Sequence, residues 1–239
     1  WVIKIGSAIL TDNGQGLSHD FIACLASDVI ALREQGREVI IVSSGAVAAG
    51  LARLGLDTRP SALDELQAAA AVGQSSLVQA YEAAFAPSGY LCAQILLSHD
   101  DVKSRDRYLN ARATLQTLLD KGVIPVVNEN DTVVTDEIRF GDDDTVAALV
   151  ANLIDADALL MLTDQQGLFN ADPRAVSNAT LIQETDAHDT SLDAMVSEGS
   201  TLGRGGMVSK LRAARLAARS GALAVIADGR DPQVVRHIA

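Results

Sequence analysis

Short runs of Val, Ile and Leu alternate along this chain with longer segments in which apolar residues recur at helical spacing. Strands are predicted at six of the short runs, residues 1–5, 38–42, 90–97, 123–127, 158–163 and 222–227. Continuous apolar strands separated by helices are typical of a mostly parallel sheet covered on both faces. The alternation therefore predicts one α/β domain over residues 1–239, with ligands bound beyond the carboxyl ends of the strands.

The segments between these strands predict helices at residues 18–35, 46–54, 61–86, 105–120 and 143–155, and another that begins near Lys210. Gly36 follows the first of these at the position where glycine commonly ends a helix. Residues 133–140 alternate between polar and apolar types, which predicts an edge hairpin. Residues 197–206, rich in Gly and Ser, are expected to be the most flexible part.

Composition excludes several classes of function. The formal net charge is -12, so the chain as a whole is not attracted to nucleic-acid phosphates or anionic lipid. No apolar run approaches the ~20 residues that span a bilayer. Only two cysteines are present, Cys24 and Cys92, and they form neither a disulfide framework nor a metal-ligand spacing, which indicates a reducing compartment. We therefore expect a cytoplasmic protein with neither a membrane nor a nucleic-acid partner.

Lys4 interrupts the first apolar strand and is followed at once by Gly6 and Ser7. A lysine is costly to bury unless it meets an anion. One interpretation is an edge strand whose lysine reaches solvent. The other is a phosphate ligand, with Gly6 letting the backbone approach the phosphate.

Polar or glycine-rich loops follow four of the other predicted elements. Residues 43–50 place Ser, Gly and Ala at a helix start, typical either of an anion site or of tight packing. Residues 128–133 gather four polar side chains, more than a plain turn needs, whereas residues 163–174 are only compatible with a nucleotide-binding wall. Residues 203–206 resemble a phosphate cradle that leads to Lys210, although neither the Walker pattern nor a GxGxxG motif is present.

Three consecutive aspartates, Asp142, Asp143 and Asp144, precede an apolar run. Aspartates stabilise a helix N-terminus, but that role does not require three. A metal site and a clamp for positively charged groups are the other interpretations.

Six motifs occur here in one order, namely KIGS (4–7), SSGA (43–46), NEND (128–131), GDDD (141–144), ADPR (171–174) and GGMVSK (205–210). In combination they resemble the amino-acid kinase family, and within it the kinases that act on glutamate, from end to end of the chain. The resemblance implies a three-layer αβα sandwich. It also implies transfer of the γ-phosphoryl group of ATP to the side-chain carboxylate of L-glutamate, which opens proline biosynthesis.

The resemblance also implies roles for individual residues. Lys4 and Lys210 would stabilise the transferred phosphoryl group, and Asp144, helped by Asp142, would hold the two lysines. Mg²⁺ would arrive with ATP, held by phosphates and water and not by a protein cage. Glutamate would be bound by Ser44, Asn128, Asp131 and Asp143, and ATP by Lys4, Gly6, Thr163, Asp164, Arg204, Gly205, Gly206, Met207 and Lys210.

The chemistry is consistent with these residues. A carboxylate with a pKa near ~4.3 is already an anion at neutral pH, so the acceptor needs no general base. The reaction instead needs positive charge that offsets the repulsion between the acceptor carboxylate and the phosphates of ATP. It also needs the two reactants to be aligned. Two positions depart from the family pattern, which has Asn where Asp143 stands and often Thr or Ser where Arg204 stands.

Further properties are expected from the resemblance alone: inhibition by proline, a homo-oligomer (dimer or tetramer), and in many relatives a C-terminal PUA domain that lies outside this chain. Alternatives are a related kinase acting on N-acetylglutamate, aspartate, carbamate or UMP, and a non-catalytic amino-acid sensor. Retention of both lysines argues against a sensor, because sensing does not require a phosphate clamp.

Overall fold

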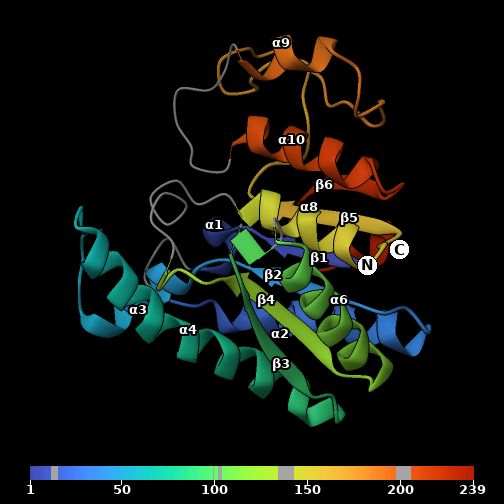
Figure 1. Ribbon diagram of the computed structural model, residues 1–239. Helices are drawn as coiled ribbons and strands as arrows, with labels where there is room; N and C mark the ends of the chain where they lie inside the picture. Colours follow the sequence, from blue (N-terminus) through green and yellow to red (C-terminus); the bar gives the residue numbers. More distant parts are fainter. Residues whose placement is uncertain (12–15, 99, 102–103, 134–142, 198–205) are drawn as a thin grey trace.

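A computed structural model of the chain describes residues 1–239 apart from 12–15, 99, 102–103, 134–142 and 198–205. Within the described part, six strands form one sheet in the order β3-β4-β2-β1-β5-β6, and every neighbouring pair is parallel (Figure 1). The predicted parallel sheet is confirmed. The strands are β1 (Val2–Ile5), β2 (Ile40–Ser43), β3 (Cys92–Leu97), β4 (Ile124–Glu129), β5 (Ala158–Thr163) and β6 (Leu223–Asp228).

The predicted helices also form, most of them with ends within two residues of those expected. The hairpin expected at 133–140 lies almost wholly outside the described residues, as does most of 197–206. Three short helices, α1, α9 and α11, were not predicted, because four to seven residues are too few to show a helical period. The helices are α1 (Ser7–Leu10), α2 (His19–Glu34), α3 (Ala46–Leu54), α4 (Leu63–Phe85), the 3-10 turn η1 (Ala86–Ser88), α6 (Arg105–Asp120), α8 (Asp143–Leu153), α9 (Ser191–Ser197), α10 (Met207–Ala218) and α11 (Val234–Ile238).

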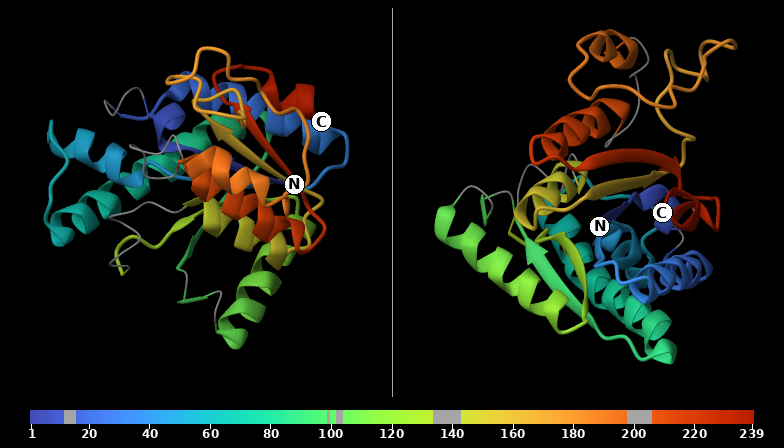
Figure 2. Two further views of the ribbon diagram at one scale, coloured as in Figure 1. Left: turned by 90° about the horizontal axis from the view of Figure 1, so that it is seen from above. Right: turned by 90° about the vertical axis from the view of Figure 1, so that its right-hand side faces the viewer.

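Alternation along the strands divides the core into two layers of side chains. Ile3 and Ile5 of β1 pack on one face, with α2, α4 and α11. Val2 of the same strand packs on the opposite face, with α6, α8 and α10. The right-hand view of Figure 2 shows α2 and α4 on one side of the sheet and α8 and α10 on the other. The expected three-layer αβα sandwich is therefore confirmed.

Helices α3 and α4 approach one another unusually closely. A Cβ atom added to Gly50 of α3 would lie 1.7 Å from the carbonyl oxygen of Ala69, and one added to Gly73 of α4 would lie 1.8 Å from that of Ala46. No real Cβ atom tolerates such distances, so each glycine admits the backbone of the other helix. The close contact holds the first turn of α3 and the middle of α4 against the carboxyl ends of β2 and β4.

None of the described helices combines the length and apolarity that crossing a bilayer would require.

We predict that Gly50→Ala lowers the free energy of unfolding by at least about 3 kcal/mol, the upper end of overpacking costs. The obstacle is a backbone carbonyl, which yields only if α4 moves. Urea unfolding measures the change.

The matched control is Gly55→Ala, which adds the same methyl group at the end of the same helix, where nothing lies within 4 Å. Gly55 has φ of 68°, so this variant should lose only about 1 kcal/mol, from backbone strain. Equal losses in the two variants would contradict the close helix contact.

Candidate active site at the carboxyl edge of the sheet

Lys4 lies on the central strand β1 and shares the face of Val2, which packs towards α6, α8 and α10. Asp144 is on the first turn of α8, and Lys210 is on the first turn of α10. An apolar strand residue at this position would continue the core. A lysine instead directs its ammonium group to the amino ends of two helices, and the solvent-exposed edge strand considered for Lys4 is excluded.

The three side chains are in direct contact. The Nζ atom of Lys4 lies 2.6 Å from Oδ1 of Asp144, and the Nζ atom of Lys210 lies 3.0 Å from Oδ2. Their side chains are 6%, 6% and 0% exposed, in the order Lys4, Lys210 and Asp144. The Ser209 hydroxyl donates a further hydrogen bond of 2.6 Å to Oδ2. We call Lys4, Asp144 and Lys210 the lysine–aspartate cluster.

The cluster perturbs its own ionisation. Burial by itself would raise the pKa of Asp144, but the charges of Lys4 and Lys210 and the hydrogen bonds from Lys4 and Ser209 outweigh burial, so that pKa lies below its usual range. Burial and the positive charge of Lys4 lower the pKa of Lys210, against the attraction of Asp144. Two ammonium groups face one carboxylate, so the cluster itself carries one net positive charge.

Polar groups also end β2 and β4, the two strands next to β1 on one side. Val42 pairs with Val127, so the following residues lie next to one another: Ser43, the last residue of β2, and Asn128, the last but one of β4. The Ser44 hydroxyl donates to the carbonyl oxygen of Ile5. Ser44 can therefore contact a ligand through its backbone N–H or its oxygen lone pairs, while its hydroxyl proton holds β1 and β2 together.

Gly45, between Ser44 and α3, adopts φ of 92°, a left-handed conformation that favours glycine. Its added Cβ would also lie 3.1 Å from the side chain of Leu10. Gly45 serves as the N-cap of α3 without any side-chain cap. The first N–H groups of the helix, which lack intrahelical partners, thus meet the carboxyl edge of the sheet.

Carboxylates Asp131 and Asp143 form the acidic side of the edge. Burial, together with the negative charge of Asp143, raises the pKa of Asp131 to about 7, while Arg59 lowers it. The two carboxylates are therefore close enough to influence one another. A site that disfavours two adjacent negative charges favours a cation between them.

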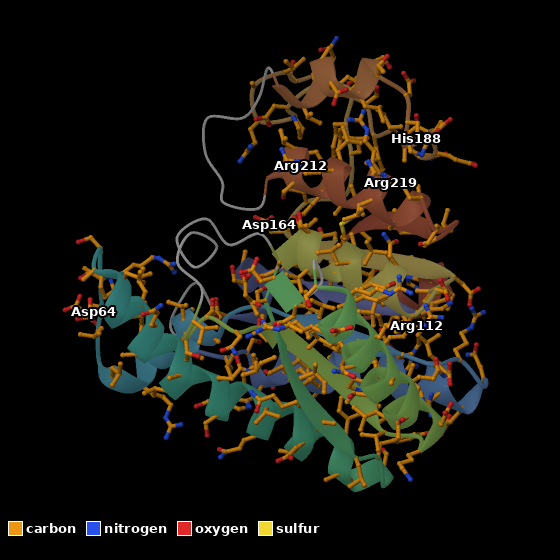
Figure 3. All side chains as sticks on the ribbon, in the orientation of Figure 1. Asp64, Arg112, Asp164, His188, Arg212 and Arg219 are labelled. Carbon is orange, nitrogen blue, oxygen red and sulfur yellow. The ribbon has the colours of Figure 1, made fainter. Side chains whose placement is uncertain are left out.

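The nucleotide side lies beyond β5. Thr163 ends that strand and its hydroxyl donates to Oδ1 of Asp164 at 3.2 Å. Asp164 is exposed. Burial and Lys4 lower the pKa of Lys210, and the charge of Asp164, like that of Asp144, opposes that lowering. Figure 3 labels Asp164 at the end of β5, between α10 and α8 in that view, with His188 well away from it.

Of the remaining predicted residues, the structure describes some, and the others lie outside the described ranges. Gly6 has φ of -73°, which any residue adopts, and an added Cβ would meet the carbonyl oxygen of Leu162 at 3.4 Å. Gly206 is the N-cap of α10, and Met207 is its first residue. Asp142, Arg204 and Gly205 lie outside the described residues.

The sequence did not point to Ser209 or Gln74 as site residues. Ser209 lies inside the GGMVSK motif, directly before Lys210, so its position next to a predicted site residue could have pointed to it. Gln74 lies in the middle of a 23-residue helix and carries no local signal. Its Oε1 accepts a 2.7 Å hydrogen bond from Nδ2 of Asn128.

Within the described ranges, no group of three or more His, Cys, Asp or Glu side chains is arranged to hold a metal ion.

A parallel sheet covered on both faces, with two buried lysines paired to an aspartate at its carboxyl edge, places this chain in the α/β class. Residues 1–228 match the amino acid kinase family, and the chain belongs to that family.

Curated relatives share most of this sequence. A glutamate 5-kinase from Saccharophagus degradans is 60% identical over 239 residues, and one from Pseudomonas putida strain GB-1 is 61% identical over 239 residues. Each alignment covers 100% of this chain and 64% of the relative. The chain thus spans less than two thirds of the length of these relatives.

Solved structures share the fold at low sequence identity. Carbamate kinase from Giardia lamblia bound to AMP-PNP has a TM-score of 0.67 at 15% identity, covering 99% of this chain and 94% of its own. An isopentenyl phosphate kinase product complex from T. acidophilum has a TM-score of 0.66 at 17% identity, covering 100% and 94%. These likenesses establish the amino-acid kinase fold.

We predict that Asp144→Asn lowers the free energy of unfolding by about 3–5 kcal/mol at neutral pH, because it leaves two buried ammonium groups without their carboxylate. The pKa of Asp144 is lowered in the folded state, so its contribution is present above the unfolded value of 3.8 and is lost as pH falls through the folded pKa. Denaturant unfolding at several pH values measures both effects.

The control is Asp155→Asn, which removes the carboxylate of the exposed Arg112–Asp155 pair and should cost less than about 1 kcal/mol. A loss at Asp144 no larger than that at Asp155 would contradict the cluster.

Proposed function

We propose that the protein transfers the γ-phosphoryl group of ATP to the side-chain carboxylate of L-glutamate, giving L-glutamyl 5-phosphate, the first step of proline biosynthesis. The observation that carries the proposal is the lysine–aspartate cluster at the same strand edge as Asp131 and Asp143. The names of the curated relatives support the substrate.

The proposed transfer is an in-line displacement. A carboxylate oxygen of glutamate forms a bond to the γ-phosphorus, the bond from that phosphorus to the bridging oxygen breaks, and ADP departs with the electron pair. No proton has to move, because the acceptor is already ionised. Lys4 and Lys210 offset the repulsion between the acceptor and the phosphates, and the amino end of α10 adds N–H donors beside them.

The acidic side of the edge suits a free amino acid. Asp131 and Asp143 would bind the α-ammonium group of glutamate, while an acetylated nitrogen has no charge to offer them. Asp144, with its lowered pKa, stays ionised at neutral pH and holds the two lysines.

We further propose that Mg²⁺ enters with ATP, coordinated by phosphates and water and neutralising phosphate charge. Inhibition by proline and a dimeric or tetrameric assembly remain predictions from the resemblance. Cytoplasmic location remains a prediction from composition, and a single kinase domain over residues 1–239 remains a prediction from the alternation of strands and helices.

A hydroxamate assay with ATP and Mg²⁺ tests the proposal against a panel of acceptors: L-glutamate, N-acetylglutamate, aspartate, carbamate and UMP, with ADP release followed for the last two. We expect turnover with L-glutamate. Activity confined to another acceptor would overturn the substrate, and binding of glutamate without ADP release would favour a sensor.

We predict that Lys4→Met and Lys210→Met each lower kcat at least about 100-fold, because a positive charge at the transferring phosphoryl group is lost. Each variant leaves one lysine paired with Asp144, so thermal unfolding should show a folded protein. Lys121→Met, which changes an exposed lysine after α6, is the control and should keep wild-type kcat. Near-normal turnover in either site variant would refute the assigned role.

We predict that the KM for glutamate rises as pH falls through about 7, because protonation of Asp131 removes its attraction for the α-ammonium group. Burial is the main cause of the raised pKa of Asp131, and the charge of Asp143 adds to it. Asp143→Asn removes that second contribution, so the rise in KM should shift to lower pH.

Steady-state kinetics between pH 5.5 and 8.5, roughly one to two units either side of that pKa, measures the effect, with the KM for ATP as internal control. A KM for glutamate that is the same with Asp143 and with Asn at every pH would contradict the role of this position.

A further inference from the structure

The orientation of two side-chain amides at the carboxyl edge is determined by one backbone group. The backbone N–H of Glu129 donates to Oδ1 of Asn128 at 2.9 Å. A backbone N–H can only donate, so the atom that faces it must be the amide oxygen. The Nδ2 group of Asn128 therefore faces Gln74 at 2.7 Å, and there it can only meet the oxygen Oε1. The oxygen and nitrogen ends of a side-chain amide have nearly the same shape, but here the hydrogen bonds determine which end is which in both Asn128 and Gln74.

This chain of bonds leaves the Nε2 group of Gln74 with two N–H donors. The atom is buried and has no hydrogen-bond acceptor among the described residues. A buried donor left without an acceptor costs about 1–3 kcal/mol. Such a donor, rigidly oriented by its neighbours, is well suited to an acceptor that arrives with a ligand.

The Nε2 group of Gln74 lies at the part of the carboxyl edge formed by α3, α4 and β4, where the amino-acid substrate is proposed to bind. Its neighbour Gly73 contacts the first turn of α3 at Ala46, whose free N–H groups follow Gly45. Asn128 is the last residue but one of β4, two strands from β1, which is about 10 Å at the spacing of adjacent strands. The reacting carboxylate must lie near Lys4 on β1, so Gln74 lies near the opposite end of an extended glutamate.

We propose that Gln74 binds the α-carboxylate of the amino-acid substrate through its Nε2 group. The inference rests on the proposed function and deepens it, because it names a residue that recognises an α-amino acid as distinct from any other carboxylate. Asn128 then acts mainly by orienting Gln74, since both ends of its own amide are occupied within the protein. The α-ammonium group lies towards Asp131 and Asp143.

Gln74→Glu is the informative variant. A glutamate at this position still accepts the hydrogen bond from Asn128, but it replaces the two donors with a negative charge that repels a carboxylate. We expect the KM for L-glutamate to rise about 10- to 100-fold, the value of a hydrogen bond to a charged group. The KM for ATP and kcat should change less than about threefold, because ground-state and transition-state binding of the α-carboxylate are lost equally.

The control is Gln79→Glu, the same substitution on the same helix at an exposed position, where the amide donates to the Ser75 hydroxyl at 3.4 Å. It adds the same charge and should leave both KM values unchanged. Gln74→Met removes the donors without adding charge, and should raise the KM for L-glutamate by a smaller factor. It also keeps the test available if the Glu variant does not fold.

A second readout is independent of turnover. Wild-type protein should gain thermal stability on addition of L-glutamate, and the Gln74 variants should gain much less at the same concentration. A fall in kcat without a rise in KM would place Gln74 at the reacting carboxylate and overturn the proposal. A wild-type enzyme active on glutamate whose Gln74 variants keep its KM would overturn this inference alone. A wild-type protein without glutamate-dependent activity would overturn the proposed function.

Discussion

The ion pairs that Asp144 makes with Lys4 and Lys210 are the interaction on which the rest of the edge depends. An ammonium group is buried only where an anion compensates for lost water, and here one carboxylate compensates for two. The three residues come from β1, α8 and α10, so their contact also determines where the amino ends of two helices stand relative to the central strand. Stability and the proposed chemistry therefore rest on the same atoms.

The carboxyl edge combines groups from both faces of the sheet. On the face of α8 and α10 it presents lysines, and on the face of α3 and α4 it presents amides and the N–H groups of a helix start. Strand alternation produces this division, because Lys4 and Asn128 point to opposite faces. The glycine contact between α3 and α4 holds the second group in place. A ligand with a phosphate end and an amino-acid end would lie across the strand ends and meet both.

Much of this architecture follows from local patterns. The strand at residues 158–163 and the helices at 46–54 and 105–120 have the predicted ends, because apolar period and flanking turn residues agree there. The end of β4 differs, since the strand continues through Asn128 and Glu129. Polar side chains normally mark a loop, and they continue a buried strand only when partners such as Gln74 are supplied from elsewhere. Those partners are invisible in a local window.

The sequence by itself determined the α/β class, the order of the strands along the chain, and the requirement that Lys4 meet either solvent or an anion. The motif resemblance already implied Asp144 as that anion. Only the tertiary structure decided that both lysines contact it directly, that Ser209 joins it, and that the amide of Gln74 meets Asn128 with its Nε2 group left without an acceptor among the described residues. The physical reason is the range of the interactions involved. Helix and strand periods arise from neighbours in sequence, whereas the charge and hydrogen-bond partners of a buried group depend on which elements pack together.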